Sequence, residues 1–480
     1  MYEPVIGLEI HAQLLTASKI FCGCSTAFGA PPNTHVCPVC LGLPGALPVL
    51  NRRAVELAVR AAHALGCTVH PASIFARKNY FYPDLPKGYQ ISQFDEPLAT
   101  DGVLRHEAGG RAVEARILRV HLEEDAGKSL HEGFPDSDRH TYLDYNRSGV
   151  PLIEIVTRPD LTSAADASGF FSRLREILVA IGVTDGNMEE GSLRCDANVS
   201  VRPSGTSELG TKTEVKNLNS FRFVQRALEY EIDRQIGILR EGGRVTQDTR
   251  LWDAAGGRTV SMRSKEEAHD YRYFPEPDLP PLRLDPAWIA RIHEDVPELP
   301  DARRRRFVAQ YGLPEYDAGV LTQSPELAAY FEAAASAASN AKAASNWIMG
   351  ELSRKMNETA VPVTAVPIGP EALAGLIRLI DSGTITGPIA RDVFEEMWAT
   401  RRSADTIVEA GGLARVDDEA AVEAAVRDVL EAHAQAAAQY RAGKKQIFGF
   451  LVGQVIKATK GTANPALVNA IMRRILDSAP

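Results

Sequence analysis

Acidic and basic side chains alternate with apolar ones along predicted strands, and their types suit metal and phosphate chemistry. In the segment 5–14, Glu9, His11 and Gln13 share one face of an extended chain, and the residues between them are apolar. Residues two apart on a strand lie roughly 6–7 Å apart. Glu9 and His11 can therefore reach one ligand from the same side of a sheet.

The same alternation recurs in three further segments. The polar positions are Asp196 and Arg202 in the segment 195–202, and Lys212 and Glu214 in the segment 211–217. In the segment 118–124 the apolar face Leu118, Val120 and Leu122 ends on Glu124. We expect this carboxylate to be partly buried and to require a cation partner.

Together these side chains predict a site for Mg²⁺ and a nucleotide on an open sheet. The candidate catalytic residues and ligands are Glu9, His11, Glu124, Asp196 and Glu214. Hard carboxylates with few sulfurs suit Mg²⁺, which commonly binds together with nucleotide phosphates, and the interleaved lysines and arginines suit phosphate. The alternative is a set of solvated sheet faces, because antiparallel sheets commonly leave one face wet.

Two loops are candidates for holding the nucleotide. The segment 78–90 is dense in aromatic residues and proline, so Tyr80 could help to stack a purine while Lys78 or Lys87 lies near phosphate. A second loop precedes the apolar strand 150–156 and offers Asn146, Arg147 and Ser148. The alternatives are a rigid loop whose aromatic side chains cover the core, and an ordinary turn.

The cysteines give a sharper signal. Cys22 and Cys24 form one close pair, and Cys37 and Cys40 form another after a short loop. Two such pairs supply four thiolates for a closed tetrahedral Zn²⁺ site, which would be structural because it has no open position. The alternatives are free buried thiols and redox pairs. Six cysteines in 480 residues are too few for a disulfide scaffold.

Three regions must position these groups. Residues 1–290 alternate short strands with helices such as 52–65, and the proline-rich segment 274–281 is a natural boundary. Residues 291–405 and 406–480 have helical periodicity, including an Ala-rich stretch at 327–350. We therefore predict an α+β domain, a helical domain and a helical tail. With 45% hydrophobic residues, no apolar run that could span a membrane and no signal peptide, we expect a cytoplasmic enzyme.

The tail differs from the rest of the chain in charge. The whole chain has a net charge of −9, whereas residues 440–480 hold seven basic residues and one acid, Asp477. The basic residues are Arg441, Lys444, Lys445, Lys457, Lys460, Arg473 and Arg474. A basic helical tail on an acidic body favours contact with the backbone of tRNA or another RNA. The alternative is a solvated helix face.

Long motifs in this order resemble the GatB/GatE family, whose GatB members are components of tRNA-dependent amidotransferases. The segments that carry the resemblance are 7–14, 37–45, 78–90, 123–128, 144–156, 191–198, 216–221, 271–279, 449–455 and Asn464-Pro465. They cover essentially the whole chain. The resemblance implies a cradle-shaped antiparallel-sheet domain similar to the glutamine synthetase and guanidino kinase fold, with a zinc-site insertion near residues 22–40. It also implies a tail similar to the YqeY helical domain, which contacts tRNA in this family.

The resemblance also implies an activity and partners. The family uses ATP and Mg²⁺ to phosphorylate the side-chain carboxylate of Glu-tRNA(Gln) or Asp-tRNA(Asn), and ammonia from the glutaminase GatA displaces the phosphate. GatC is the third component of the heterotrimer, and a non-discriminating aminoacyl-tRNA synthetase is a possible further partner. The family's metal and kinase positions fall on the five candidates above; Asp196 and Glu214 would bind a second metal or guide ammonia. Two other classes are a ligase that takes a free amino acid and a non-catalytic RNA-binding protein.

Overall fold

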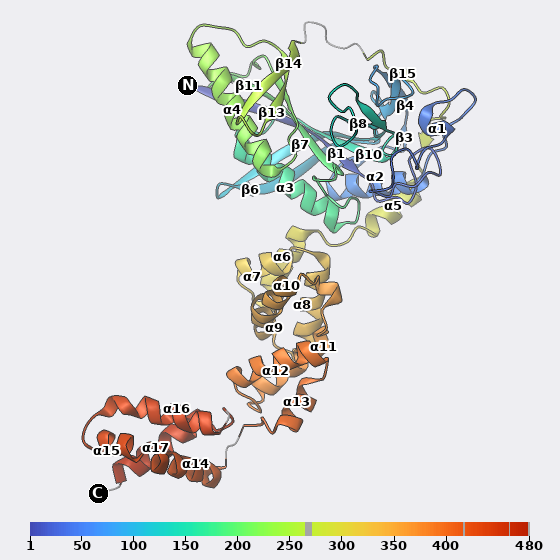
Figure 1. Cartoon of the computed structure of the whole chain (residues 1–480). Coiled ribbons are helices and arrows are strands. Elements are labelled where there is room, and N and C mark those ends of the chain that lie inside the picture. The colour runs from blue at the N-terminus through green and yellow to red at the C-terminus, as the bar shows by residue number, and fades with distance from the viewer. Residues whose placement is uncertain (265–270, 416–417, 460, 479–480) are drawn as a thin grey trace. The chain divides into compact units, whose positions relative to one another are not determined.

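The computed structural model describes residues 1–264, 271–415, 418–459 and 461–478, and it divides the chain into two compact units (Figure 1). One unit spans Met1–Leu299 and the other Pro300–Pro480. Lys460, one of the basic residues expected in the tail, lies outside the described residues. The predicted α+β class is confirmed, because a large sheet with helices fills the first unit and helices fill the second.

A nine-stranded sheet, counted over the described residues, is the frame of the first unit. Its order is β14-β13-β12-β11-β1-β10-β7-β6-β2, and only β12 and β13 pair in parallel. The strands are β1 (Tyr2–Gln13), β2 (Thr68–Val69), β6 (Ala99–Ala108), β7 (Arg111–Glu124), β10 (Pro151–Thr157), β11 (Leu193–Pro203), β12 (Thr213–Lys216), β13 (Asp248–Asp253) and β14 (Arg258–Ser264). The expected antiparallel sheet thus has one parallel pair.

Helices α2 (Arg52–Ala64), α3 (Ala164–Ala180) and α4 (Phe221–Arg240) cover one face of this sheet (Figure 1). Each begins at a side-chain cap, namely Asn51, Ser163 or Ser220. Strand β1 alternates as predicted, because its apolar side chains are buried under the helices. The polar side chains of β1 consequently face the other side of the sheet.

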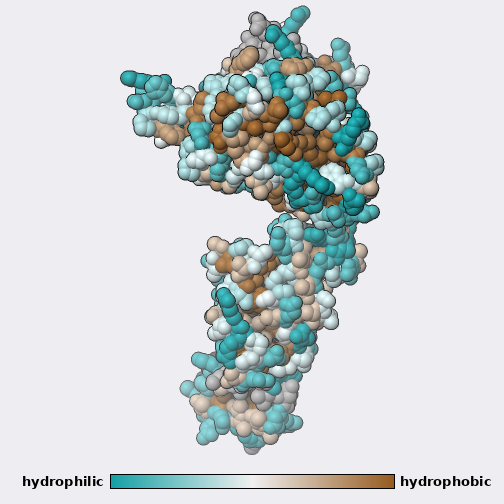
Figure 2. Space-filling model, turned by 90° about the vertical axis from the view of Figure 1, so that its right-hand side faces the viewer, coloured by the Kyte–Doolittle hydropathy of each residue, from teal (hydrophilic) through white to brown (hydrophobic). Residues whose placement is uncertain are grey.

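Smaller elements surround the uncovered face. They are α1 (Pro38–Leu41), β3 (Ala72–Ser73), β4 (Phe75–Asn79), β5 (Tyr89–Gln93), β8 (Lys128–Leu130), β9 (Tyr142–Asp144), β15 (Phe274–Pro275), β16 (Leu282–Arg283) and α5 (Pro286–Glu294). The proline-rich segment 274–281 lies within the first unit, because β15 pairs with β4 and Arg77 donates two hydrogen bonds to the buried Glu276. The side of the unit on which α1 lies carries broad apolar surface among polar residues (Figure 2).

The second unit consists of helices around two clusters of buried residues, one from Phe307 to Val408 and one from Val422 to Leu476. The helices are α6 (Pro300–Tyr311), α7 (Glu315–Leu321), α8 (Pro325–Ala338), α9 (Ala341–Trp347), η1 (Ile348–Leu352), α10 (Ser353–Thr359), η2 (Val363–Ala365), α11 (Pro370–Asp381), α12 (Gly387–Thr400), α13 (Ala404–Gly411), α14 (Glu419–Ala432), α15 (Ala434–Arg441), η3 (Lys445–Ile447), α16 (Phe448–Ala458) and α17 (Pro465–Ser478). Among the described residues, no helix is long and apolar enough to cross a membrane.

The Ala-rich stretch at 327–350 is interrupted rather than continuous. Ser339 has a positive φ of 54° and ends α8, and the side chain of Asn340 caps the start of α9. A π-helical turn, η1, follows α9 directly. Alanine content therefore predicted the helical state of this segment but not its break.

Candidate active site

Strand register brings polar side chains into rows across the uncovered face of the sheet. In one row His11 on β1 lies between Arg194 on β11 and Glu154 on β10, and Glu154 in turn lies opposite His121 on β7. In the next row Glu9 lies opposite Asp196. Because side chains at paired positions point to the same face, each row collects groups from strands that are distant in sequence.

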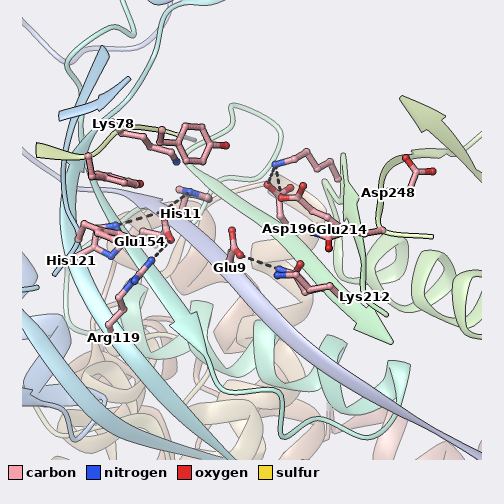
Figure 3. A pocket seen from close by; sticks show the side chains of 16 residues that line it. Glu9, His11, Lys78, Arg119, His121, Glu154, Asp196, Lys212, Glu214 and Asp248 are labelled. Carbon is pink, nitrogen blue, oxygen red and sulfur yellow. Dashed lines mark hydrogen bonds and ion pairs between the residues drawn. The ribbon is translucent and has the colours of Figure 1, made fainter. Parts of the chain in front are cut away.

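These rows line a cavity of about 480 Å³ (Figure 3). Its lining residues are Glu9, His11, Lys78, Phe94, Arg119, His121, Glu154, Asp196, Asn198, Lys212, Glu214, Lys216, Gln247, Asp248, Tyr271 and Tyr273. Six residues predicted from the sequence are thus brought together: Glu9, His11, Lys78, Asp196, Lys212 and Glu214. The cavity combines carboxylates, imidazoles and cations, which is typical of a site for charged substrates.

A histidine–carboxylate cluster forms one end of the cavity. His11 Nε2 lies 3.3 Å from Glu154 Oε2 and 3.6 Å from Glu123 Oε1. His121 Nε2 lies 3.6 Å from the same Glu154 oxygen. Ligand atoms of His11, Glu123 and Glu154 all lie within 4.8 Å of one another, a spacing that one metal ion could bridge.

Burial and mutual charge set the protonation of this cluster. Burial opposes a charge on His11, but the hydrogen bond and negative charge of Glu154 outweigh it and raise the pKa of His11 to about 9. Burial raises the pKa of Glu123 to about 7, with the charge of Glu154 adding to it. Burial lowers the pKa of His121 to about 4. The cluster therefore holds a compressed set of acids and bases that a bound cation would relieve.

A lysine bridges two carboxylates at the other end of the cavity. Lys216 Nζ lies 2.9 Å from Asp196 Oδ2 and 3.1 Å from Glu214 Oε1. The hydroxyl of Thr249 donates a hydrogen bond to the other Glu214 oxygen at 2.9 Å. This end of the cavity is therefore built to hold an ammonium group. Between the two ends lies Glu9, which accepts a hydrogen bond from Asn198 and whose pKa is raised, mainly by burial (Figure 3).

Lys78 projects into the cavity from β4 beside aromatic rings (Figure 3). Its Nζ lies 4.9 Å from the ring centroid of Tyr271 and 5.9 Å from that of Tyr80. Within the described residues, no hydrogen bond or ion pair engages this ammonium group. Lys78 is therefore available to bind an anionic ligand.

Glu124 lies on the opposite face of β7 from this cavity. It is buried, as the end of an apolar face predicts, and its cation partner is Lys87, which the loop 78–90 supplies. The backbone N–H of Ile91 also donates to Glu124 Oε1 at 2.8 Å. The structure therefore separates Glu124 and Lys87 from Glu9 and His11, although all four were expected in one site.

We expect Glu124→Gln to destabilise the first unit by about 3 kcal/mol, because it leaves the buried Lys87 ammonium without its charged partner. Thermal unfolding of the first unit measures this effect. The matched control is Glu114→Gln on the same strand, whose pair with Arg105 is exposed and contributes less than about 1 kcal/mol. An unchanged melting temperature together with lost phosphorylation would instead give Glu124 a direct part in the chemistry.

The other expected nucleotide contacts lie outside the cavity lining. The Tyr80 hydroxyl donates to Gln90, and Arg202 pairs with Glu3. In the second loop, Asn146 donates to the carbonyl of Pro31, Arg147 donates to Ala126 and Gly127, and Ser148 donates to Cys40. The second loop thus bonds mainly to neighbouring backbone.

Four residues of the cluster were not predicted from the sequence: Arg119, His121, Glu123 and Glu154. A bulge on β7 places Ile117 and Val120 on the same, buried face and removes Leu118 from it. The alternation of His121 and Glu123 opposite Val120 and Leu122 was a readable signal. Glu154 was readable too, as the one acid within the apolar strand 150–156.

The four cysteines predicted to bind zinc meet at one place. Their Sγ atoms all lie within 4.8 Å of one another, and Cys40 is 3.5 Å from Cys22 and 3.7 Å from Cys37. Tetrahedral Zn–S bonds of about 2.3 Å place sulfurs about 3.8 Å apart, so this donor set fits zinc. The hydrogen bond from Cys22, followed by the charge of Lys19, lowers the pKa of Cys40 to about 4 despite burial.

A sheet that gathers carboxylates, imidazoles and lysines in one cavity, followed by helical bundles, defines an enzyme with a polar catalytic sheet domain. The family model of the GatB/GatE catalytic domain matches residues 4–290, and the model of the GatB domain matches residues 329–476. The chain therefore belongs to the GatB/GatE family.

Curated relatives agree over nearly the full length. Proteins named as the B component of aspartyl/glutamyl-tRNA(Asn/Gln) amidotransferase are similar to this chain in three organisms. The relative from Chlorobaculum tepidum is 54% identical over 99% of this chain and 100% of its own length. Those from Geotalea uraniireducens and Anaeromyxobacter sp. (strain K) are 54% and 56% identical, over 99% of both chains in each case.

Proposed function

We propose that this chain, as the GatB component of a tRNA-dependent amidotransferase, uses the cavity to activate the side-chain carboxylate of Glu-tRNA(Gln) or Asp-tRNA(Asn) with ATP. The observation that carries the proposal is the convergence of His11, Glu123 and Glu154 in a cavity that also receives the ammonium of Lys78. The names of the relatives support the reaction, because amidation of a carboxylate requires a good leaving group in place of its oxygen.

His11, Glu123 and Glu154 are the residues that would hold Mg²⁺. This set keeps His11 from the expected ligands and replaces Glu124 by two carboxylates on the cavity face. When bound, Mg²⁺ supplies charge screening for the nucleotide phosphates and the approaching carboxylate. Glu9 lies between the two ends and is available either as a further ligand or as an acceptor of the proton that ammonia loses.

Lys78 would bind phosphate oxygens of ATP, and Tyr271 would keep that ammonium oriented. The carboxylate oxygen of the substrate attacks the γ-phosphorus, and ADP leaves. Ammonia then attacks the acyl carbon, and phosphate leaves with the carbon–oxygen bond electrons. Asp196 and Glu214 would receive ammonia or ammonium, since they already bind the ammonium of Lys216.

The remaining expectations complete this proposal. Cys22, Cys24, Cys37 and Cys40 would hold a structural Zn²⁺, and the first unit would have the cradle fold of glutamine synthetases and guanidino kinases. The helices from α14 onward would form a YqeY-like tail that contacts tRNA. GatA, GatC and a non-discriminating synthetase would be partners in the cytoplasm, where aminoacyl-tRNA is made and used.

The test uses the chain purified together with its GatA and GatC partners. The complex receives Mg-ATP, glutamine and either Glu-tRNA(Gln) or Asp-tRNA(Asn), and the amino acid is then released from the tRNA and identified. We expect an amide product that requires both ATP and this chain. The tRNA on which it forms identifies the substrate.

Two other outcomes would replace the proposal. ATP hydrolysis without amide on either tRNA would favour a ligase that takes a free amino acid. Absence of both amide and ATP turnover would favour a non-catalytic RNA-binding protein.

A further inference from the structure

The segment from Cys22 to Leu50 has almost no apolar core of its own. Among its described residues Cys40 is the only apolar side chain that is buried, whereas Phe28, Leu43, Leu47 and Val49 are exposed. This segment includes α1, on the side of the unit where apolar residues reach the surface (Figure 2). A stretch of this size without a core requires another source of order, and a metal bound by its cysteines is one.

This segment holds a second loop, residues 142–149, almost entirely through hydrogen bonds. The Asn33 backbone N–H donates to Asp144 Oδ1 at 3.0 Å, and the Tyr145 N–H donates to Asn33 Oδ1 at 2.8 Å. The His35 N–H donates to Asn146 Oδ1 at 2.8 Å. The loop 142–149 therefore depends on the cysteine segment for the partners of its polar groups.

Lys19 lies at the junction of the two segments and is completely buried. Its Nζ donates to the carbonyl of His35 at 2.7 Å and to that of Tyr145 at 3.3 Å, and it lies 3.5 Å from Cys40 Sγ. Lys19 therefore touches the cysteine cluster, the segment that carries it and the loop 142–149 at once.

The loop 142–149 leads on to the floor of the cavity. Arg147 donates to the carbonyls of Ala126 and Gly127 and lies 3.7 Å from Asp125. Asp125 is buried and accepts two hydrogen bonds from Arg194, at 2.9 and 3.0 Å. Arg194 is the residue that pairs with His11 in the sheet register. An unbroken set of polar contacts thus joins Cys40 to the row that contains His11.

We propose that Lys19 couples the metal state of the cysteine cluster to the position of the loop 142–149 and, through Arg147 and Asp125, to the cavity. This inference rests on the proposed zinc site. Four thiolates and one Zn²⁺ carry two net negative charges, and the Lys19 ammonium neutralises one of them in a place that water does not reach. Loss of the metal releases His35 and Asn33, and the loop then loses its partners.

The test measures zinc affinity and local order in the full-length chain. Zinc content and affinity come from mass spectrometry and competition with a chelator, and hydrogen exchange reports on a peptide that covers 142–149. We expect one zinc per chain, faster exchange of this peptide after chelation, and about 10-fold weaker zinc binding in Lys19→Met. Lys19→Arg, which keeps the charge, is expected to recover part of the affinity.

The control is Lys128→Met. Lys128 lies 4.8 Å from the ring of Phe28 in the same segment, but among the described residues it contacts no cysteine. Its removal should leave zinc affinity unchanged. Wild-type protein without zinc would overturn the zinc site and this coupling together. Bound zinc whose removal leaves the exchange of 142–149 unchanged would overturn the coupling alone, and unchanged affinity in Lys19→Met would remove Lys19 from it. If Lys19→Met does not fold, chelation of the unaltered chain still decides.

Discussion

Glu154→Gln should lower the rate of ATP-dependent amide formation about 10²–10³-fold. Glu154 contacts both His11 and His121 and is one of the three groups that converge within reach of a single ion. The amide keeps the shape of the side chain but removes the negative charge, and a metal site that loses one of three anionic or neutral ligands forfeits several kcal/mol of charge stabilisation. The Mg²⁺ concentration required for half-maximal rate should rise as well.

The assay is amide formation on tRNA by the complex, with glutamine hydrolysis by the amidase partner measured in parallel. Glutamine hydrolysis should be retained, because the substitution lies in this chain. Glu114→Gln serves again as the control, because Glu114 is exposed on β7 outside the cavity. A full rate in Glu154→Gln at low Mg²⁺ would remove Glu154 from the proposed ligand set and return attention to Glu124.

Strand alternation predicted which faces of β1, β11 and β12 are polar, and this placed Glu9, Asp196 and Glu214 correctly in one cavity. Alternation is local, so a single strand suffices to read it. The same reading assigned Glu124 to the site, because the sequence does not reveal that β5 and Lys87 cover the other face of β7.

The convergence of His11 with Glu154 depends on the pairing of β1 with β10, which are far apart in the chain. Register between distant strands is fixed by packing and turn geometry rather than by either strand's composition. The same holds for Tyr271 and Tyr273, which reach the cavity because β15 pairs with β4. The cysteine pairs were easier to predict, because their spacing alone limits how four sulfurs can meet.

Reversing three charges in the tail should weaken tRNA binding about 10-fold or more in roughly 0.1 M salt. Arg441, Lys444 and Lys457 are exposed, and no carboxylate among the described residues pairs with them. Other basic residues of the tail are engaged: Arg474 pairs with Glu419 and Glu423, and Lys445 pairs with Asp477. The first three are therefore the cations best placed to contact phosphates. Binding of labelled tRNA to the triple variant Arg441→Glu, Lys444→Glu, Lys457→Glu, measured across salt concentrations, tests this.

The salt dependence separates a direct contact from a structural effect. Each phosphate contact releases about one counterion, so the slope of log affinity against log salt should fall by about 2–3 in the triple variant. The control is Arg304→Glu with Arg305→Glu, which reverses two exposed charges in α6, a helix that we interpret as solvated. That variant should keep both affinity and slope. Equal losses in the two variants would indicate a general effect of chain charge, and an unchanged affinity in the triple variant would exclude the tail as the tRNA contact. Because the substituted side chains lie outside the cavity, the rate of carboxylate activation at saturating tRNA should be the same in all three proteins.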